Sequence, residues 1–142
     1  MEQCLLCHLE LVPSQNVILS NEYCMFLQLD EAREKGVQLE GAGIIVPKIH
    51  RETAFDLTKE EWNATYELLQ KVKQYLDELY EPSGYNLGWN CGEVAGQHIN
   101  HAHFHVLPRY KEEALAGKGI RYMFKAEKNK RNVMEFNVSE EL

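Results

Sequence analysis

Three histidines stand two residues apart between residues 101 and 105. In an extended strand, side chains two residues apart point to the same face, each about 6.6 Å beyond the last. We therefore predict a strand on which His101, His103 and His105 share one face, while the residues between them face a core. Four of the six histidines lie between residues 98 and 105. Packing alone would not select that, so the pattern indicates a chemical site.

Imidazole is a good nucleophile near neutral pH and a good leaving group once it is attached to phosphorus. A strand histidine is therefore suited to two-step transfer of a nucleotidyl group. Two other interpretations stay open. His101, His103 and His105 could be ligands of a catalytic metal with an open coordination position, or they could hold a ligand without turning it over.

The cysteines suggest a second kind of site. Cys4 and Cys7 have the spacing with which two thiolates bind one tetrahedral zinc ion, but such a site needs two further ligands. Cys24 lies in an apolar run and Cys91 in a loop, and neither has a partner by spacing. We expect all four thiols to be reduced, because the chain lacks secretory features.

Several short motifs accompany the histidines in a fixed order. They are Cys4-Leu5-Leu6-Cys7, Val46-Pro47-Lys48-Ile49-His50, Asn90-Cys91-Gly92, Ala95-Gly96-Gln97 and His101-Ala102-His103-Phe104-His105-Val106-Leu107. The last fits the pattern His-φ-His-φ-His-φ-φ, in which φ is hydrophobic. On these motifs the chain resembles the histidine triad family of nucleotide hydrolases and transferases, over roughly residues 4–109.

The resemblance implies a role for each residue of the site. The middle histidine, His103, would attack the α-phosphorus of a nucleoside phosphate, such as a dinucleoside polyphosphate or a nucleoside phosphoramidate. The carbonyl group of His101 would accept a hydrogen bond from the other ring nitrogen of His103. Relatives often have Ser or Thr where this chain has His98. His98 is either a further hydrogen-bond donor to the phosphate or an exposed loop residue without a functional role. The expected contacts to the phosphate are Asn90, Gln97, His98 and His105.

The resemblance also implies a metal, a ribose contact and a partner. His50 and His101 would complete a structural zinc site with Cys4 and Cys7, with one zinc per chain and His8 as the rival fourth ligand. Relatives place an acidic residue after the first strand pair to hold the ribose, and the nearest residues here are Gln28 and Asp30. Family members usually form homodimers in which two sheets join edge to edge, so we expect the same of this chain.

The elements that must position these residues can be read along the chain. Short β-favouring apolar runs predict strands at residues 17–19, 23–27, 43–46, 85–90 and 101–107. Thr58 and Glu61 form a capping box that opens a helix ending near Tyr80, before Pro82-Ser83-Gly84. Its expected buried stripe consists of Trp62, Leu69, Val72, Leu76 and Leu79. We predict an α+β fold, with an antiparallel sheet of about five strands and one long helix.

Bulk properties limit the possible partners. A chain of 142 residues fits a single domain, here a core at about 4–109 and an extension at about 110–142. A net charge of −7 argues against general nucleic-acid binding, and no apolar run is long enough for a membrane span. We expect a cytoplasmic protein. The basic stretch at 117–131 is interpreted as a solvated face, and no clear periodicity is seen beyond Arg109.

Overall fold

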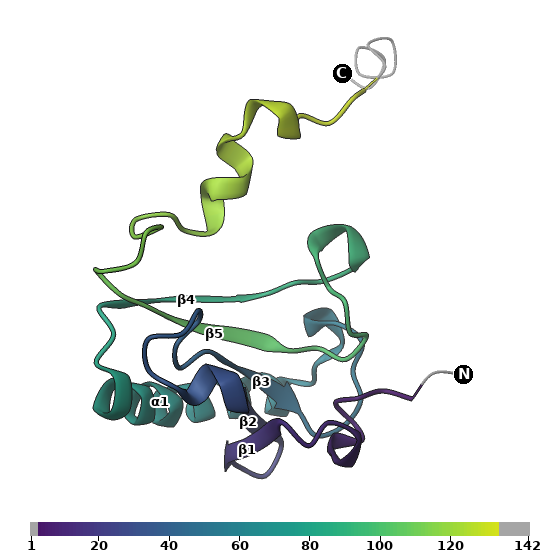
Figure 1. Cartoon of the computed structure of the whole chain (residues 1–142). Helices are drawn as coiled ribbons and strands as arrows, with labels where there is room; N and C mark the ends of the chain where they lie inside the picture. The colour runs from purple at the N-terminus through teal and green to yellow at the C-terminus, as the bar shows by residue number, and fades with distance from the viewer. Residues whose placement is uncertain (1–2, 134–142) are drawn as a thin grey trace.

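The computed structural model describes residues 3–133. It contains a five-stranded antiparallel sheet with the strand order β1-β2-β3-β5-β4, and one long helix, α1, lies against one face of this sheet (Figure 1). The predicted α+β single domain is confirmed. The elements are β1 Gln15–Ser20, β2 Cys24–Leu29, β3 Gly43–Pro47, α1 Lys59–Tyr80, β4 Gly84–Trp89 and β5 Phe104–Arg109.

Helix α1 begins and ends at clear local signals. Thr58 accepts a hydrogen bond from the backbone of Glu61, and the Glu61 carboxylate accepts one from the backbone of Thr58, so the predicted capping box is present. Glu81 ends the helix in the left-handed conformation, with φ of 51°. The helix therefore has the bounds that the sequence predicts.

The core lies between α1 and the sheet, but the predicted buried stripe is partly wrong. Trp62 and Leu79 are 44% and 43% exposed. The stripe that faces the sheet is rotated from the predicted one, and Trp62 packs at its margin on Trp89, with ring centroids 5.4 Å apart. The buried helix residues that pack on β2, β3 and β5 are Ala64, Leu68, Val72, Leu76 and Tyr80.

The histidine strand starts later than its alternating pattern predicts. β5 begins at Phe104, and residues 101–103 lie outside the strand, with a bend at His101. The backbone N–H of Ala102 donates to the carbonyl group of Arg51 over 2.6 Å instead of joining the sheet. The ring of His101 contacts Cys4, Cys7 and the carbonyl group of Pro47, whereas His103 and His105 line a pocket.

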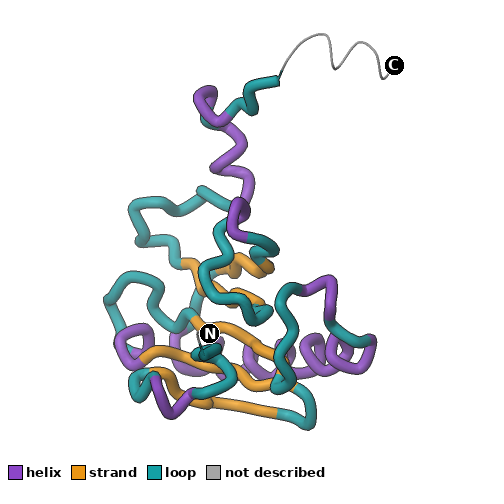
Figure 2. The backbone as a smooth tube through the Cα atoms, turned by 90° about the vertical axis from the view of Figure 1, so that its right-hand side faces the viewer, coloured by secondary structure: helices purple, strands orange, loops and turns teal. Residues whose placement is uncertain are grey.

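The connections also differ in detail from the sequence prediction. The expected solvated loop at residues 30–36 does separate β2 from β3, but it starts with a 3-10 turn, η2 Asp30–Arg33, whose Ala32 is buried. Beyond β5, residues 117–133 are exposed and contain the 3-10 segments η5 Ile120–Lys125 and η6 Glu127–Asn129. Figures 1 and 2 show this segment standing away from the sheet. The predicted extension continues past residue 133, outside the described residues.

None of the helices in residues 3–133 has the length and apolar character that crossing a lipid bilayer requires.

Candidate active site and metal centre

Four of the predicted metal ligands meet at one point. The ligand atoms of Cys4, Cys7, His50 and His101 all lie within 4.8 Å of one another. The Nδ1 atom of His101 is 3.4 Å from both sulfur atoms, and the Nδ1 atom of His50 is 3.3 Å from the Cys7 sulfur. A tetrahedral zinc ion with ordinary bond lengths separates its sulfur and nitrogen ligands by roughly 3.5 Å. The two-sulfur, two-nitrogen set therefore fits zinc.

Local structure orients each ligand of this cluster. The backbone N–H groups of Cys7 and His8 both donate to the carbonyl group of Cys4 over 3.1 Å, so a tight turn brings the two sulfurs together. His101 is fully buried, and its Nε2 donates to the carbonyl group of Pro47 over 2.8 Å, which leaves Nδ1 unprotonated for a metal. Burial lowers the pKa of His101, which favours the neutral ring. His8 contacts Glu10 instead and stays outside the cluster.

His103 is held in one tautomer by the backbone. Its Nδ1 donates to the carbonyl group of His101 over 2.8 Å, so the lone pair is on Nε2. The side chain is only 9% exposed. Burial lowers the pKa of His103, the nearby rings of His105 and His98 lower it further, and the bond to the carbonyl group offsets this in part. The result is a neutral imidazole with one nitrogen ready to act as a nucleophile.

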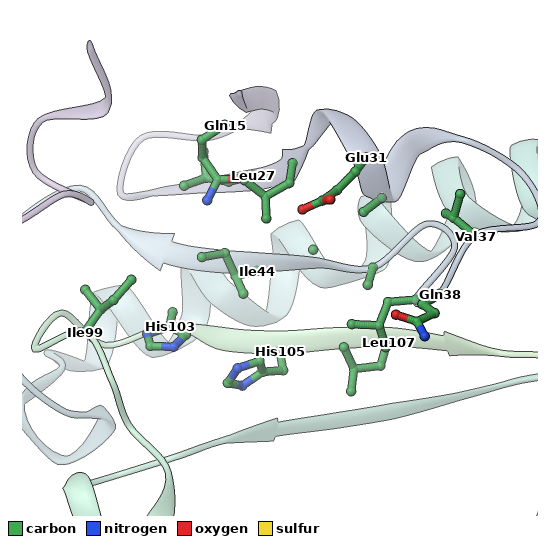
Figure 3. Close-up of a pocket in the computed structure, with 15 residues that line it drawn as sticks. Gln15, Leu27, Glu31, Val37, Gln38, Ile44, Ile99, His103, His105 and Leu107 are labelled. Atoms are coloured by element: carbon green, nitrogen blue, oxygen red, sulfur yellow. The ribbon is translucent and has the colours of Figure 1, made fainter. Parts of the chain in front are cut away.

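His105 lies beside His103 on the same strand face. The two ring centroids are 4.9 Å apart, and His105 donates from Nδ1 to the carbonyl group of Gly88 in β4 over 3.2 Å. This places two imidazoles, each with its Nδ1 bound to the backbone, along one wall of a pocket (Figure 3). His101 is not part of that wall.

Gln97 organises the loop that precedes the histidines. It is 4% exposed, and its Nε2 donates to the carbonyl groups of Glu52 and Ile99 over 2.6 and 3.0 Å. Its Oε1 accepts from the backbone N–H of Gly92 over 2.8 Å. Both amide hydrogens are thus used inside the chain, and a contact to phosphate requires one of these bonds to be exchanged.

The other two predicted phosphate contacts are more open. Asn90 is half-buried, and its Nδ2 lies 3.3 Å from the position that a Cβ atom on Gly96 would take. Gly96 has φ of 97°, so the absence of a side chain there both permits the turn and leaves room for Asn90. His98 is exposed and does not line the pocket.

The pocket beside His103 has a volume of about 510 Å³, which is in the range of small-molecule sites. Its walls are mainly apolar, and in the view of Figure 3 Leu27 and Ile44 lie above the histidines and Leu107 lies beside them. Gln15, Glu31 and Gln38 add polar groups. An apolar cleft that ends at two histidines can take a flat base and a sugar, with the phosphate at the histidine end.

The ribose contact cannot come from Gln28. This side chain is fully buried on the helix side of β2, and its Nε2 donates to the carbonyl group of Gly41 over 2.9 Å. Asp30 accepts from Asn16 over 2.7 Å, and neither residue lines the pocket. Glu31, which the sequence analysis missed, does line it, because η2 turns the chain inward after β2.

Comparison with known protein families agrees with this geometry. The HIT domain model matches residues 11–112, and the chain belongs to the HIT domain family. The protein hit of Bacillus subtilis is 29% identical over 111 residues, which are 77% of this chain and 72% of that protein. Adenosine 5'-monophosphoramidase hnt1 of Schizosaccharomyces pombe is 31% identical over 80 residues, 56% of this chain and 57% of that enzyme.

Solved structures show the same fold. A HIT family protein from Bacillus anthracis is 25% identical with a TM-score of 0.69, and the match covers 99% of this chain and 94% of that one. A zinc-bound histidine triad family protein from Mycobacterium smegmatis is 21% identical with a TM-score of 0.63, and 82% of each chain is covered. The chain therefore belongs to a family that contains nucleotide hydrolases.

Proposed function

We propose that this protein is a nucleotide hydrolase or transferase that cleaves at the α-phosphorus of a nucleoside phosphate derivative. The observation that carries the proposal is the fixed tautomer of His103, whose unprotonated Nε2 belongs to a ring lining an apolar pocket. Nε2 would attack the α-phosphorus while the bond to the leaving group breaks. Water or another acceptor would then attack phosphorus and release the histidine. Dinucleoside polyphosphates and nucleoside phosphoramidates are the proposed substrate classes.

The neighbouring residues would serve the phosphate and the nucleoside. His105, Asn90 and His98 can donate to phosphoryl oxygens, which must be met by preorganised donors as charge moves during transfer. Gln97 would join them only after one of its internal hydrogen bonds is exchanged. Glu31 is the carboxylate in the pocket that can accept hydrogen bonds from a nucleoside.

We also propose one zinc ion per chain, held by Cys4, Cys7, His50 and His101. With four protein ligands, the site would be closed and structural. It would fix the amino-terminal segment to the residue whose carbonyl group orients His103. Zinc in this position would supply structural rigidity and no catalytic water.

Two other functions make different predictions. In a metal-dependent hydrolase, His101, His103 and His105 would share a catalytic metal. The contacts of His101 with the two cysteines and of the His103 Nδ1 with a carbonyl group argue against this. In a nucleotide-binding module without catalysis, wild-type protein would bind nucleotides and show no turnover.

The test is turnover of a fluorogenic AMP amide by wild type, His103→Gly and the control His8→Gly, which removes an imidazole outside the pocket. We expect His103→Gly to lose turnover while AMP still binds, and His8→Gly to keep both. Mass spectrometry of rapidly quenched wild type should show a nucleotide adduct on His103. Unchanged turnover in His103→Gly would refute the assignment, and turnover that depends on an added metal would favour the second function.

A further inference from the structure

The segment of residues 117–131, called the basic arm from here on, has a charge opposite to the rest of the chain. It contains six cationic residues and one acidic residue, whereas residues 1–116 contain nine cationic and eighteen acidic residues. Opposite charges on two parts of a molecule favour their association, either within one copy or between copies. The basic arm is therefore complementary to the body of this same protein.

The arm also presents apolar side chains to water. Ile120, Tyr122, Met123 and Phe124 are 62%, 51%, 67% and 73% exposed. Both views of the molecule show the arm clear of the sheet (Figures 1 and 2). Four large apolar side chains on a short exposed segment are typical of a segment that packs on a partner surface.

The root of the arm is fixed beside the outer strand β4. Arg109, the last residue of β5, donates to the carbonyl groups of Lys118 and Leu115 over 2.7 and 2.9 Å and to the Asn86 side chain in β4. A Cβ atom on Gly119 would lie 3.7 Å from the Asn86 amide. The arm thus leaves the body at the edge of the sheet, because β4 is the terminal strand.

Pairing of two copies through the β4 edge would fix where the histidine site of one copy lies relative to the basic arm of the other. A two-fold dimer that pairs β4 with its counterpart would set the two strands antiparallel. The start of β4 in one copy, near the arm, would then lie beside the end of β4 in the other. This end is the histidine end, because Trp89 pairs with Phe104, which lies between His103 and His105. The arm of one copy would therefore approach the site of the other.

The nucleotide site needs positive charge that its own walls do not supply. The described residues that line the pocket of His103 and His105 include neither Lys nor Arg. A polyphosphate carries several negative charges, which preorganised cations stabilise most strongly. Within η5, Arg121 and Lys125 form no ion pair with another residue of the 3–133 segment.

We propose that the basic arm of one copy covers the histidine site of a second copy, and that Arg121 and Lys125 contact the polyphosphate of the substrate there. The inference rests on the proposed function and adds the residues that select highly charged substrates. Each site is complete only in the dimer.

The first experiment compares two substrates of different charge. The variant with Arg121→Glu and Lys125→Glu should lose about tenfold or more in kcat/KM on a dinucleoside tetraphosphate, because charge-assisted hydrogen bonds are lost. On an AMP amide, which has a single negative charge at the phosphorus, the loss should be at most about threefold. The control variant, Lys59→Glu with Lys71→Glu, makes the same change in net charge at two exposed positions of α1. Its kcat/KM on both substrates should stay within about twofold of wild type. Equal losses on both substrates would overturn the proposal.

The second experiment asks whether the arm acts on the other copy. A mixed dimer of His103→Gly and the double arm variant, isolated through two different affinity tags, contains one intact histidine site facing one intact arm. It should therefore have about half of the wild-type activity on the tetraphosphate. A mixed dimer no more active than the double arm variant would overturn the proposal, as would a monomeric wild type in light scattering at assay concentration.

A third measurement separates this proposal from the proposed function. Calorimetry should show weaker binding of the tetraphosphate to the double arm variant, and this holds even if wild type has no turnover at all. Absence of turnover with that affinity difference would refute the proposed function and support the arm. If the double arm variant keeps the affinity and turnover of wild type but no longer binds RNA, the basic arm would be assigned to nucleic-acid binding. That result would overturn the proposal.

Discussion

Glu61 connects the long helix to the histidine loop, and its removal is expected to destabilise the fold. The carboxylate is almost fully buried and accepts from Nε of Arg51 over 3.0 and 3.2 Å and from the backbone of Thr58 over 2.8 Å. Arg51 in turn follows His50, and its carbonyl group accepts from Ala102. Glu61→Gln keeps an acceptor for the helix cap but removes the negative charge that Arg51 faces.

The size of the effect follows from the burial of the pair. Breaking a fully buried ion pair costs about 3–5 kcal/mol, and an exposed pair contributes roughly 0.2–1 kcal/mol. The side chain of Glu61 is 2% exposed and that of Arg51 is 28% exposed, so we expect Glu61→Gln to lower the free energy of unfolding by about 2–3 kcal/mol. For a domain of this size, that corresponds to a fall in Tm of roughly 6–12 °C.

The same pair makes stability depend on pH in a defined direction. Burial alone would raise the pKa of Glu61, but the bonds from Arg51 and Thr58 outweigh it, and the pKa lies below its ordinary value of 4.5. A carboxylate with a lowered pKa stabilises the folded state above the unfolded pKa, and this contribution is lost as pH falls through the folded pKa. The Tm difference between wild type and Glu61→Gln should therefore be widest near neutral pH and close in acid.

Calorimetric unfolding of wild type, Glu61→Gln and the exposed neighbour Glu60→Gln tests both expectations. Glu60→Gln should stay within about 0.5 kcal/mol of wild type. The reasoning is refuted if Glu61→Gln unfolds with the same free energy as Glu60→Gln, or if their Tm difference grows as the solution is acidified.

Two further predictions concern the proposed metal site and the loop that contains Gly96 and Gln97. Cys4→Ser with Cys7→Ser should reduce zinc in elemental analysis from about one ion per chain to none and lower Tm, whereas Cys91→Ser should change neither; metal-free wild type would contradict this. Gly96→Ala should lower the free energy of unfolding by about 1–2 kcal/mol through backbone strain. The added methyl group should also displace the side-chain amide of Asn90, with about a tenfold loss in kcat/KM. Gly88→Ala, where a Cβ atom meets nothing within 4 Å, should be close to wild type in both stability and turnover.

Much of the fold could be predicted because its signals are local. The capping box at Thr58 and the apolar runs of the strands depend on residues a few positions apart, and both are found in the structure. The buried face of α1 was predicted less well. Trp62 is exposed because the packing of the helix on the sheet, and not periodicity, determines which neighbouring row is covered.

The candidate site shows the same division. The spacing of His103 and His105 is enough to place them side by side. The irregular backbone before Phe104 depends on a hydrogen bond to Arg51, about fifty positions earlier in the chain, which no local pattern contains. Glu31 was missed for a similar reason, because only the turn η2 brings it into the pocket.

By itself, the sequence determined which side chains are present for chemistry, namely alternating histidines that can attack phosphorus and a pair of thiols that can bind a metal. The tertiary structure decided which atoms meet. It brings Cys4 and Cys7 to His101 across more than ninety residues, uses the Gln97 amide within the loop, and leaves the basic arm beside an open strand edge. The physical reason is that side-chain type and spacing act over a few residues, whereas contacts between distant segments depend on how the whole core packs.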